Sequence, residues 1–261
     1  IRDRFFYDII RVLRVYLIVK ISRILLLFLH ERHGTIMKTL FVALFLLIYF
    51  LLSIPLLFIE FIIGKFNKQL KVRSSQKIVV TAFKVILAGC GVKKTVLGLE
   101  NIPSDQPVLY VANHRSYFDI LVGYTSVPTL TGFVAKKEMR KLPFISSWMK
   151  NLNCLFLDRD NIREGMKTIL EGIELVKNGH SIFIAPEGTR NQEKEMLPFK
   201  EGSFKIAEKS GCPIIPVAMN NTDAIFEQHL PWIRKGHVII EFGKPIYIKE
   251  LQTEDKKHLS L

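Results

Sequence analysis

The strongest constraint in this chain is a long apolar block near its beginning. From Thr39 to Ile59, 21 consecutive residues carry no charge. Coiled as an α-helix at about 1.5 Å per residue, they would reach about 31 Å, which is the thickness of a bilayer's hydrocarbon core. Any fold of this chain must therefore cover the block with lipid or with a large protein surface.

Positive charge is concentrated on both sides of this block. The 261 residues carry 37 Lys and Arg against 24 Asp and Glu, a formal net charge of +13. Residues 1–38 hold eight Lys or Arg and residues 65–94 hold eight more, whereas residues 95–261 are nearly balanced. This distribution favours attraction to anionic membrane lipids. It disfavours nucleic acid as a partner, which usually requires a basic surface on the folded domain.

The flanking charges also indicate how the block sits in a membrane. A single span would place one basic flank on the outer face, against the preference of Lys and Arg for the cytosolic side. We therefore expect residues 1–64 to form a two-helix membrane motif in one leaflet, with residues 5–29 along the interface and residues 36–63 dipping into the acyl region. Pro55 is expected to kink the second helix. An ordinary single-pass anchor is the alternative.

These features predict a protein at the cytoplasmic face of the cell membrane. The three cysteines, Cys90, Cys154 and Cys212, lie far apart without a CxxC pattern, which favours neither a disulfide framework nor a zinc site. A reduced, cytosol-facing compartment agrees with that. No small-residue cleavage site follows an early apolar stretch, so we expect no removed signal peptide. We also expect no metal and no dedicated cofactor, because the nucleotide-loop, nucleophile-elbow and HExxH patterns are missing.

Beyond a basic connecting helix at residues 65–94, residues 95–261 are expected to form one α/β domain. Short β-rich runs alternate with helical patterns there, which predicts a mostly parallel central sheet flanked by helices. The clearest helix is Ile162–Asn178, which Gly179 should end, and another covers Glu201–Ser210. The expected strands are Val108–Ala112, Gly132–Ala135, Cys154–Leu157, Ser181–Ala185, Pro213–Ala218 and His237–Phe242.

Polar clusters follow four of these strands, at the point where each strand ends. They comprise residues 113–119, 136–138, 158–160 and 186–190. The carboxyl ends of parallel strands meet at one edge of a sheet, and open α/β sheets bind their ligands at that edge. The four clusters should therefore converge on one crevice.

The first cluster contains a His and an Asp five residues apart. Within a regular helix His114 and Asp119 would point about 140° away from each other. They can cooperate if His114 lies in the strand-to-helix turn and Asp119 in the first helical turn, with Ser116 as the N-cap. Two interpretations remain open at this point: Asp119 serves as a capping acid, or it orients His114 as a general base.

Together, the clusters resemble the HxxxxD glycerolipid acyltransferases, most closely the bacterial 1-acylglycerol-3-phosphate acyltransferases. The resemblance rests on His114 and Asp119 with the segment Glu187–Arg190. It extends, in the family's order, to Lys136–Glu138, Phe156–Asn161 and Ile214–Val217, and it covers residues 95–250. A two-helix N-terminal membrane motif also resembles members of this family.

This resemblance implies an enzyme that acylates lysophosphatidic acid to phosphatidic acid in phospholipid synthesis. His114 would take the proton of the acceptor hydroxyl, Asp119 would orient the imidazole, and an acyl thioester of acyl-carrier protein or coenzyme A would be the donor. The alternatives are transfer to glycerol-3-phosphate or to another lysophospholipid, or a non-catalytic lipid-binding scaffold. Backbone N–H groups near Gly188 are candidates for binding the oxyanion.

A phosphorylated acceptor requires cations, and three follow separate strands. Lys136, Arg159 and Arg190 are the predicted phosphate ligands, since guanidinium forks and ammonium groups both bind phosphate oxygens. In the same loop, Gly188 and Thr189 are expected to contact substrate. Glu187 is expected either to bind acceptor hydroxyls or to pair with Arg190. Two further predictions concern neighbours: Lys137 is not expected to bind phosphate, and Tyr117 and Phe118 are expected to be packing residues.

Overall fold

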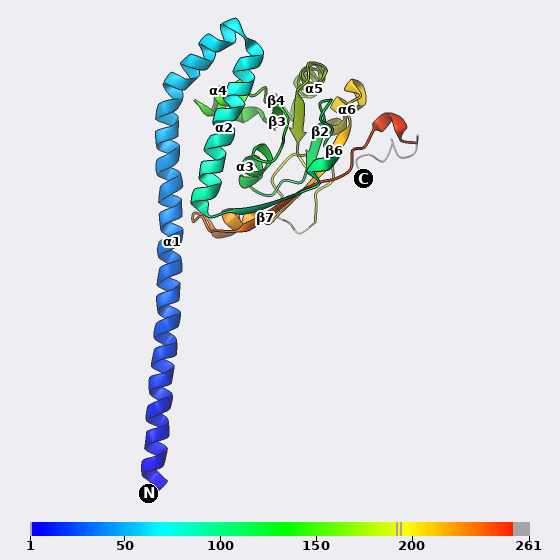
Figure 1. Cartoon of the computed structure of the whole chain (residues 1–261). Helices are drawn as coiled ribbons and strands as arrows, with labels where there is room; N and C mark the ends of the chain where they lie inside the picture. Colours follow the sequence, from blue (N-terminus) through cyan, green and yellow to red (C-terminus); the bar gives the residue numbers. More distant parts are fainter. Residues whose placement is uncertain (1, 192, 194, 253–261) are drawn as a thin grey trace.

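The computed structural model describes residues 2–191, 193 and 195–252, with side chains from residue 33 onward. Two long N-terminal helices form a hairpin that lies against an α/β domain (Figure 1). The first, α1, runs from Arg2 to Phe66, and the second, α2, from Lys68 to Cys90. Asn67 joins them and caps α2 by accepting the N–H of Leu70 at 2.8 Å.

The expected pair of helices at residues 5–29 and 36–63 is wrong, because α1 is continuous through both ranges. Between them the chain offers one weak helix breaker, Gly34, and a single glycine costs only about 1 kcal/mol relative to alanine. The hairpin's second helix is instead α2, within the predicted basic connecting segment. Pro55 lies inside α1, whose last turns bend toward α2 (Figure 1).

One side of α1 is docked onto the rest of the protein. Ser53, which is fully buried, accepts the indole N–H of Trp148 at 2.9 Å. Glu60, 2% exposed, accepts the hydroxyl of Ser74 in α2 at 2.8 Å. The Phe41 ring lies on Gly89 so closely that a Cβ there would collide with it. The opposite side of α1 exposes large apolar side chains: Leu40, Leu44, Leu47, Leu51, Leu52, Phe58 and Ile59.

The domain is built on a seven-stranded, mostly parallel sheet, which confirms the predicted fold class. The strands are β1 (Lys93–Leu97), β2 (Leu109–Ala112), β3 (Thr131–Lys136), β4 (Leu155–Leu157), β5 (Ser181–Ile184), β6 (Ile214–Asn220) and β7 (His237–Phe242). Their spatial order is β1-β7-β6-β2-β5-β3-β4, and only β6 and β7 pair antiparallel. The sequence prediction missed β1, whose two lysines hide the β pattern, and the predicted domain boundary at residue 95 falls inside it.

Helices cover both faces of this sheet (Figure 1). On one face, α2, α3 (Phe118–Tyr124) and α4 (Ile145–Asn151) pack over a core that includes Tyr110 and Phe133. On the other, α5 (Ile162–Lys177) and α6 (Lys205–Ser210) pack over Leu109 and Ile182. The 3₁₀ helices are η1 (Leu99–Asn101), η2 (Lys137–Lys141), η3 (Glu201–Phe204), η4 (Asp223–Ile225), η5 (Glu227–His229) and η6 (Ile248–Glu250). The helix predicted from Glu201 therefore begins as a 3₁₀ turn.

Replacing Ser53 by alanine should loosen α1 from the domain. The change removes the hydrogen-bond acceptor of the buried Trp148 indole N–H, and an unsatisfied buried donor costs about 1–3 kcal/mol. The melting temperature of the detergent-solubilised protein should fall. Thr81→Ala is the matched control, because that exposed hydroxyl bonds to the Lys77 carbonyl in its own helix. Equal melting temperatures for the two variants would contradict the docking.

Candidate active site

The site is built on the turn that follows β2. The side chain of Asn113 continues the pairing of β2 with β6, since it donates to the Met219 carbonyl at 2.9 Å and accepts the Met219 N–H at 2.7 Å. This pair of hydrogen bonds to the neighbouring strand fixes the chain one residue before His114. His114 therefore enters the turn from a rigid sheet edge, which suits a residue that must hold a fixed orientation.

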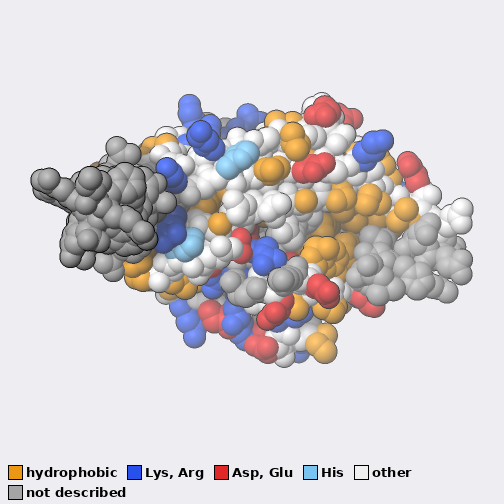
Figure 2. All heavy atoms as spheres, turned by 90° about the horizontal axis from the view of Figure 1, so that it is seen from below, with side chains coloured by type: hydrophobic (Ala, Val, Ile, Leu, Met, Phe, Trp, Pro, Cys, Tyr) orange, Lys and Arg blue, Asp and Glu red, His pale blue; other side chains and the backbone are white. Residues whose placement is uncertain are grey.

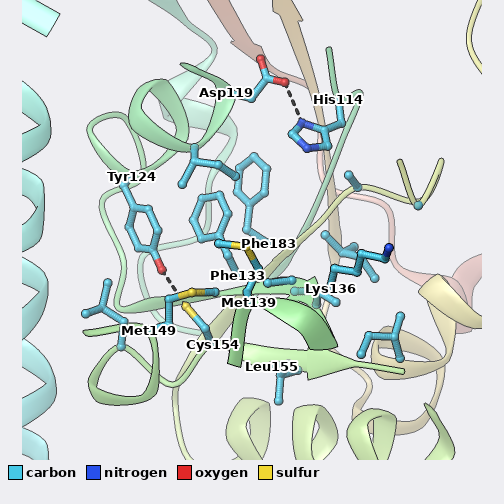
Figure 3. Close-up of a pocket in the computed structure, with 18 of the residues that line it drawn as sticks. His114, Asp119, Tyr124, Phe133, Lys136, Met139, Met149, Cys154, Leu155 and Phe183 are labelled. Atoms are coloured by element: carbon cyan, nitrogen blue, oxygen red, sulfur yellow. Dashed lines mark hydrogen bonds and ion pairs between the residues drawn. The ribbon is translucent and has the colours of Figure 1, made fainter. Parts of the chain in front are cut away.

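His114 and Asp119 are in direct contact. The His114 Nδ1 lies 2.8 Å from Asp119 Oδ2, and the same oxygen accepts the backbone N–H groups of Arg115 at 2.7 Å and Ser116 at 2.8 Å (Figure 3). Asp119 is 3% exposed and His114 is 23% exposed. One carboxylate oxygen thus both shapes the turn and holds the imidazole.

The capping detail differs from the expectation. The helix α3 begins at Phe118, and the Ser116 hydroxyl accepts the N–H of Phe118 at 2.9 Å, so Asp119 is its second residue rather than its third. The Asp119 carboxylate accepts the backbone N–H groups of Arg115 and Ser116, which precede it in the chain. The two readings of Asp119 are therefore compatible, because one carboxylate makes both sets of contacts.

The second ring nitrogen of His114 faces a large cavity. A Nδ1–H that donates to the carboxylate leaves Nε2 with a free lone pair, and Figure 3 shows the ring directed into the cavity. The cavity has a volume of about 910 Å³. Apolar side chains line its depth, including Tyr124, Phe133, Met149 and Phe183, and α1 contributes part of its wall: Phe45, Leu46, Tyr49 and Phe50.

The predicted cations reach this same cavity from three strand ends. Lys136 ends β3, Arg159 follows β4 and Arg190 follows β5, and all three line the cavity with His114. Burial lowers the pKa of the Arg159 guanidinium. Lys137, by contrast, pairs with Asp158 at 2.8 Å and does not line the cavity.

Arg190 stacks on the ring of Tyr117, a residue that the sequence analysis predicted to be a packing residue. Its guanidinium lies 3.7 Å from the centre of the Tyr117 ring, and its Nη2 donates to the Tyr117 hydroxyl at 3.0 Å. Tyr117 is 56% exposed, so its prediction as a packing residue is wrong, whereas Phe118 is buried as expected. The short stretch before α3 alternates outward and inward side chains, which the apolar pattern alone did not reveal.

Glu187 adopts neither of its two expected roles. It is 4% exposed and does not line the cavity. Its Oε1 accepts the backbone N–H of His114 at 3.0 Å, and its Oε2 accepts the N–H of Leu197 and the side chain of Asn191, both at 3.0 Å. Because the Asn191 N–H also donates to the His114 carbonyl at 2.7 Å, Glu187 fastens its own loop to the His114 turn.

The neighbouring loop residues take separate positions. Gly188 has a φ of +77°, which favours glycine, and its N–H donates to the Ala185 carbonyl at 3.1 Å. That N–H is therefore engaged in the turn. Gly188 and Thr189 both line the cavity, as does Lys200, a cation that the sequence analysis missed. The Lys200 backbone N–H donates to the Pro186 carbonyl at 3.0 Å, which places the residue beside this loop.

One buried acid was also missed. Glu227, in η5, contacts Ser116, Tyr117 and Arg190. Its sequence surroundings carry no motif, and the partners lie far away in the chain, so no local signal identified it. Among the residues that the structure describes, no three His, Cys, Asp or Glu side chains cluster as a metal site.

Comparisons with known proteins show which proteins this chain is similar to. A family model described as Acyltransferase matches residues 93–220. The 1-acyl-sn-glycerol-3-phosphate acyltransferase of Saccharomyces cerevisiae is 35% identical over 174 residues, which cover 66% of this chain and 56% of the yeast protein. The chloroplastic BAT2 enzyme of Brassica napus is 37% identical over 159 residues, 59% of this chain and 45% of its own length. This chain thus spans about half the length of these two relatives.

A bacterial relative and a solved structure match more completely. The 1-acyl-sn-glycerol-3-phosphate acyltransferase of Borreliella burgdorferi is 30% identical over 177 residues, covering 68% of this chain and 71% of that protein. The crystal structure of the 1-acyl-sn-glycerophosphate acyltransferase PlsC from Thermotoga maritima superposes with a TM-score of 0.74 at 27% identity, covering 88% of this chain and 92% of that one. On this evidence the chain belongs to the 1-acyl-sn-glycerol-3-phosphate acyltransferase family.

Proposed function

We propose that this protein transfers a fatty acyl group from an acyl thioester to the free hydroxyl of lysophosphatidic acid, giving phosphatidic acid. One observation carries the proposal: the His114–Asp119 pair opens into a cavity that has cations at the strand ends and an apolar depth. A phosphate fits the first part and a hydrocarbon chain the second. The names of the relatives support the same reaction.

The proposed chemistry requires no nucleophile from the protein. His114 Nε2 accepts the proton of the acceptor hydroxyl as its oxygen attacks the thioester carbon. Asp119 holds the ring by its Nδ1 and stabilises the positive charge that the imidazole acquires. When the tetrahedral intermediate collapses, the C–S bond breaks and the thiol leaves with the proton that His114 returns. Both acyl-carrier protein and coenzyme A present such a thioester, and either fits this scheme as the donor.

The acceptor phosphate is assigned to the cationic side of the cavity. Lys136, Arg159 and Arg190 would bind its oxygens, with Lys200 as a fourth cation. A guanidinium binds two phosphate oxygens at once, which fixes the direction of the glycerol chain and hence the place of its hydroxyl. Thr189 and Gly188 would contact the substrate from the same loop. Glu187 is proposed to act indirectly, through the backbone of His114.

We place α1 in one leaflet on the cytoplasmic face rather than across the bilayer. The domain contacts α1 at the start of the apolar block and again within it: Ile233 donates to the Thr39 hydroxyl at 3.0 Å, and Trp148 donates to Ser53. A helix that crossed the membrane could not keep the polar domain along its side. Lys and Arg side chains on the end of the molecule that Figure 2 shows would meet anionic headgroups.

This placement gives lipid substrates a direct route to the site. Residues 33–66 form a helix apolar enough to cross a membrane, yet only 6% of its most apolar window is buried in the protein. Phe45 and Tyr49 face the cavity, while Leu44 and Leu51 face outward. A lysophospholipid in the same leaflet would therefore pass along α1 without leaving its apolar surroundings.

Replacing His114 by alanine should lower kcat for acyl transfer by a factor of about 10²–10⁴, the usual contribution of a general base. Asp119→Asn should also lower it strongly, because the amide disturbs the three donors on Oδ2. Transfer of a labelled acyl group to a panel of acceptors, with membrane association measured in parallel, provides the test. His237→Ala, on the exposed start of β7, is the control. Turnover at the wild-type rate in His114→Ala would refute the mechanism.

Replacing Arg190 or Lys136 by alanine should raise KM for lysophosphatidic acid about tenfold, because each change removes one phosphate ligand. The KM for the acyl donor should stay within about twofold. Lys137→Ala serves as the control, since Lys137 adjoins Lys136 but pairs with Asp158. If only the donor's KM changed, the phosphate assignment would be wrong.

Cysteines placed at both ends of the apolar helix should be labelled from the same side of the membrane. His33→Cys and Lys68→Cys are suitable because both positions are exposed, whereas the native Cys90, Cys154 and Cys212 are buried and should react slowly. An impermeant maleimide added to sealed vesicles should label both variants or neither. Labelling of one variant only would show that the helix spans the bilayer.

A further inference from the structure

The carboxylate of Glu227 connects the turn between His114 and Asp119 with Arg190, and it lies outside the segment that the family model matches. Glu227 follows β6, and the matched segment ends at residue 220. Its side chain is 6% exposed. Because β6 lies beside β2 in the sheet, the segment after β6 reaches the turn that carries His114 and Asp119. No sequence motif directs attention to it, so its importance follows from contacts alone.

Glu227 holds the middle of the catalytic turn. Its Oε2 accepts the Ser116 hydroxyl at 2.6 Å, and its Oε1 accepts the Tyr117 backbone N–H at 2.7 Å. These two residues lie between His114 and Asp119 in the chain. Asp119 thus stabilises the turn by accepting the N–H groups of Arg115 and Ser116. Glu227 stabilises the same turn from a distant part of the chain, through Ser116 and Tyr117.

Glu227 also holds the guanidinium of Arg190. Its Oε1 lies 3.5 Å from Arg190 Nη1. The guanidinium also contacts Tyr117, through the ring face at 3.7 Å and the hydroxyl at 3.0 Å. Since Glu227 fixes the Tyr117 backbone as well, it orients Arg190 both directly and through the Tyr117 ring. A carboxylate on a side chain that is only 6% exposed requires such charged or N–H partners.

We infer that Glu227 is a positioning residue that sets the Arg190 guanidinium at a fixed place relative to His114, and so aligns the acceptor's phosphate with its reacting hydroxyl. This inference rests on the proposed function, in which Arg190 binds that phosphate. Glu227 does not line the cavity, so we assign it no direct contact with either substrate. Its effect is therefore on geometry, and its removal should weaken acceptor binding more than donor binding.

Glu227→Gln tests this inference, because it keeps the size of the side chain and removes its charge. We expect KM for lysophosphatidic acid to rise about five- to tenfold, with donor KM unchanged within about twofold and a smaller fall in kcat. Glu100→Gln is the matched control, an exposed glutamate in a 3₁₀ turn that follows a strand. Thermal unfolding of both variants identifies a loss of folded protein, which would lower the measured rate without changing acceptor KM. An unchanged acceptor KM in folded Glu227→Gln would overturn the inference.

The combination with Arg190→Ala shows whether the two residues act as a unit. If Glu227 acts through Arg190, the double variant should have the acceptor KM of Arg190→Ala alone, because the guanidinium to be oriented is gone. Effects that multiply instead would show an independent action and would overturn the inference.

A second experiment measures phosphate binding without measuring acyl transfer. Inorganic phosphate should raise the melting temperature of the wild type and of Glu100→Gln, and raise that of Glu227→Gln much less. Equal stabilisation of all three, or none of the wild type, would overturn the inference. If phosphate binding depends on Glu227 but the wild type does not acylate lysophosphatidic acid, the proposed function fails while the positioning role stands.

Discussion

The site depends on one carboxylate oxygen. Asp119 Oδ2 accepts a hydrogen bond from the His114 ring and from two backbone N–H groups of the turn between them. A side chain that held only the imidazole would leave the turn free to open, and one that capped only the turn would leave the ring free to rotate. Because both tasks fall on one buried atom, the turn and the ring have a fixed mutual orientation.

The proposed reaction also requires that a lipid reach this pair, and in the proposed arrangement α1 provides the route. The helix α1 carries apolar side chains on two sides, and each side has a different neighbour. One side packs on the domain and lines the cavity through residues such as Tyr49, and the other exposes leucines that a bilayer would cover. Buried polar contacts such as Ser53 with Trp148 fix its position, because a uniformly apolar surface by itself would not select one docking arrangement.

The candidate site was largely predictable because its residues follow strands. Polar side chains after β2, β3, β4 and β5 had to meet once those strands formed a parallel sheet, and His114, Lys136, Arg159 and Arg190 do line one cavity. The roles of side chains within each loop were less predictable. Glu187 turns away from the cavity to bind the His114 N–H, since its direction depends on how the loop closes and not on its neighbours in sequence.

By itself, the sequence determined the fold class, six of the seven strands, the apolar helix and the residues that carry the proposed chemistry. These features are encoded over a few neighbouring residues, by hydrophobic period, turn residues and charge. Only the tertiary structure decided that α1 is one continuous helix paired with α2, that Tyr117 supports Arg190, and that Glu227 reaches the turn between His114 and Asp119. Such contacts join residues far apart in the chain, and which of them meet depends on strand order and helix docking, which no local pattern records.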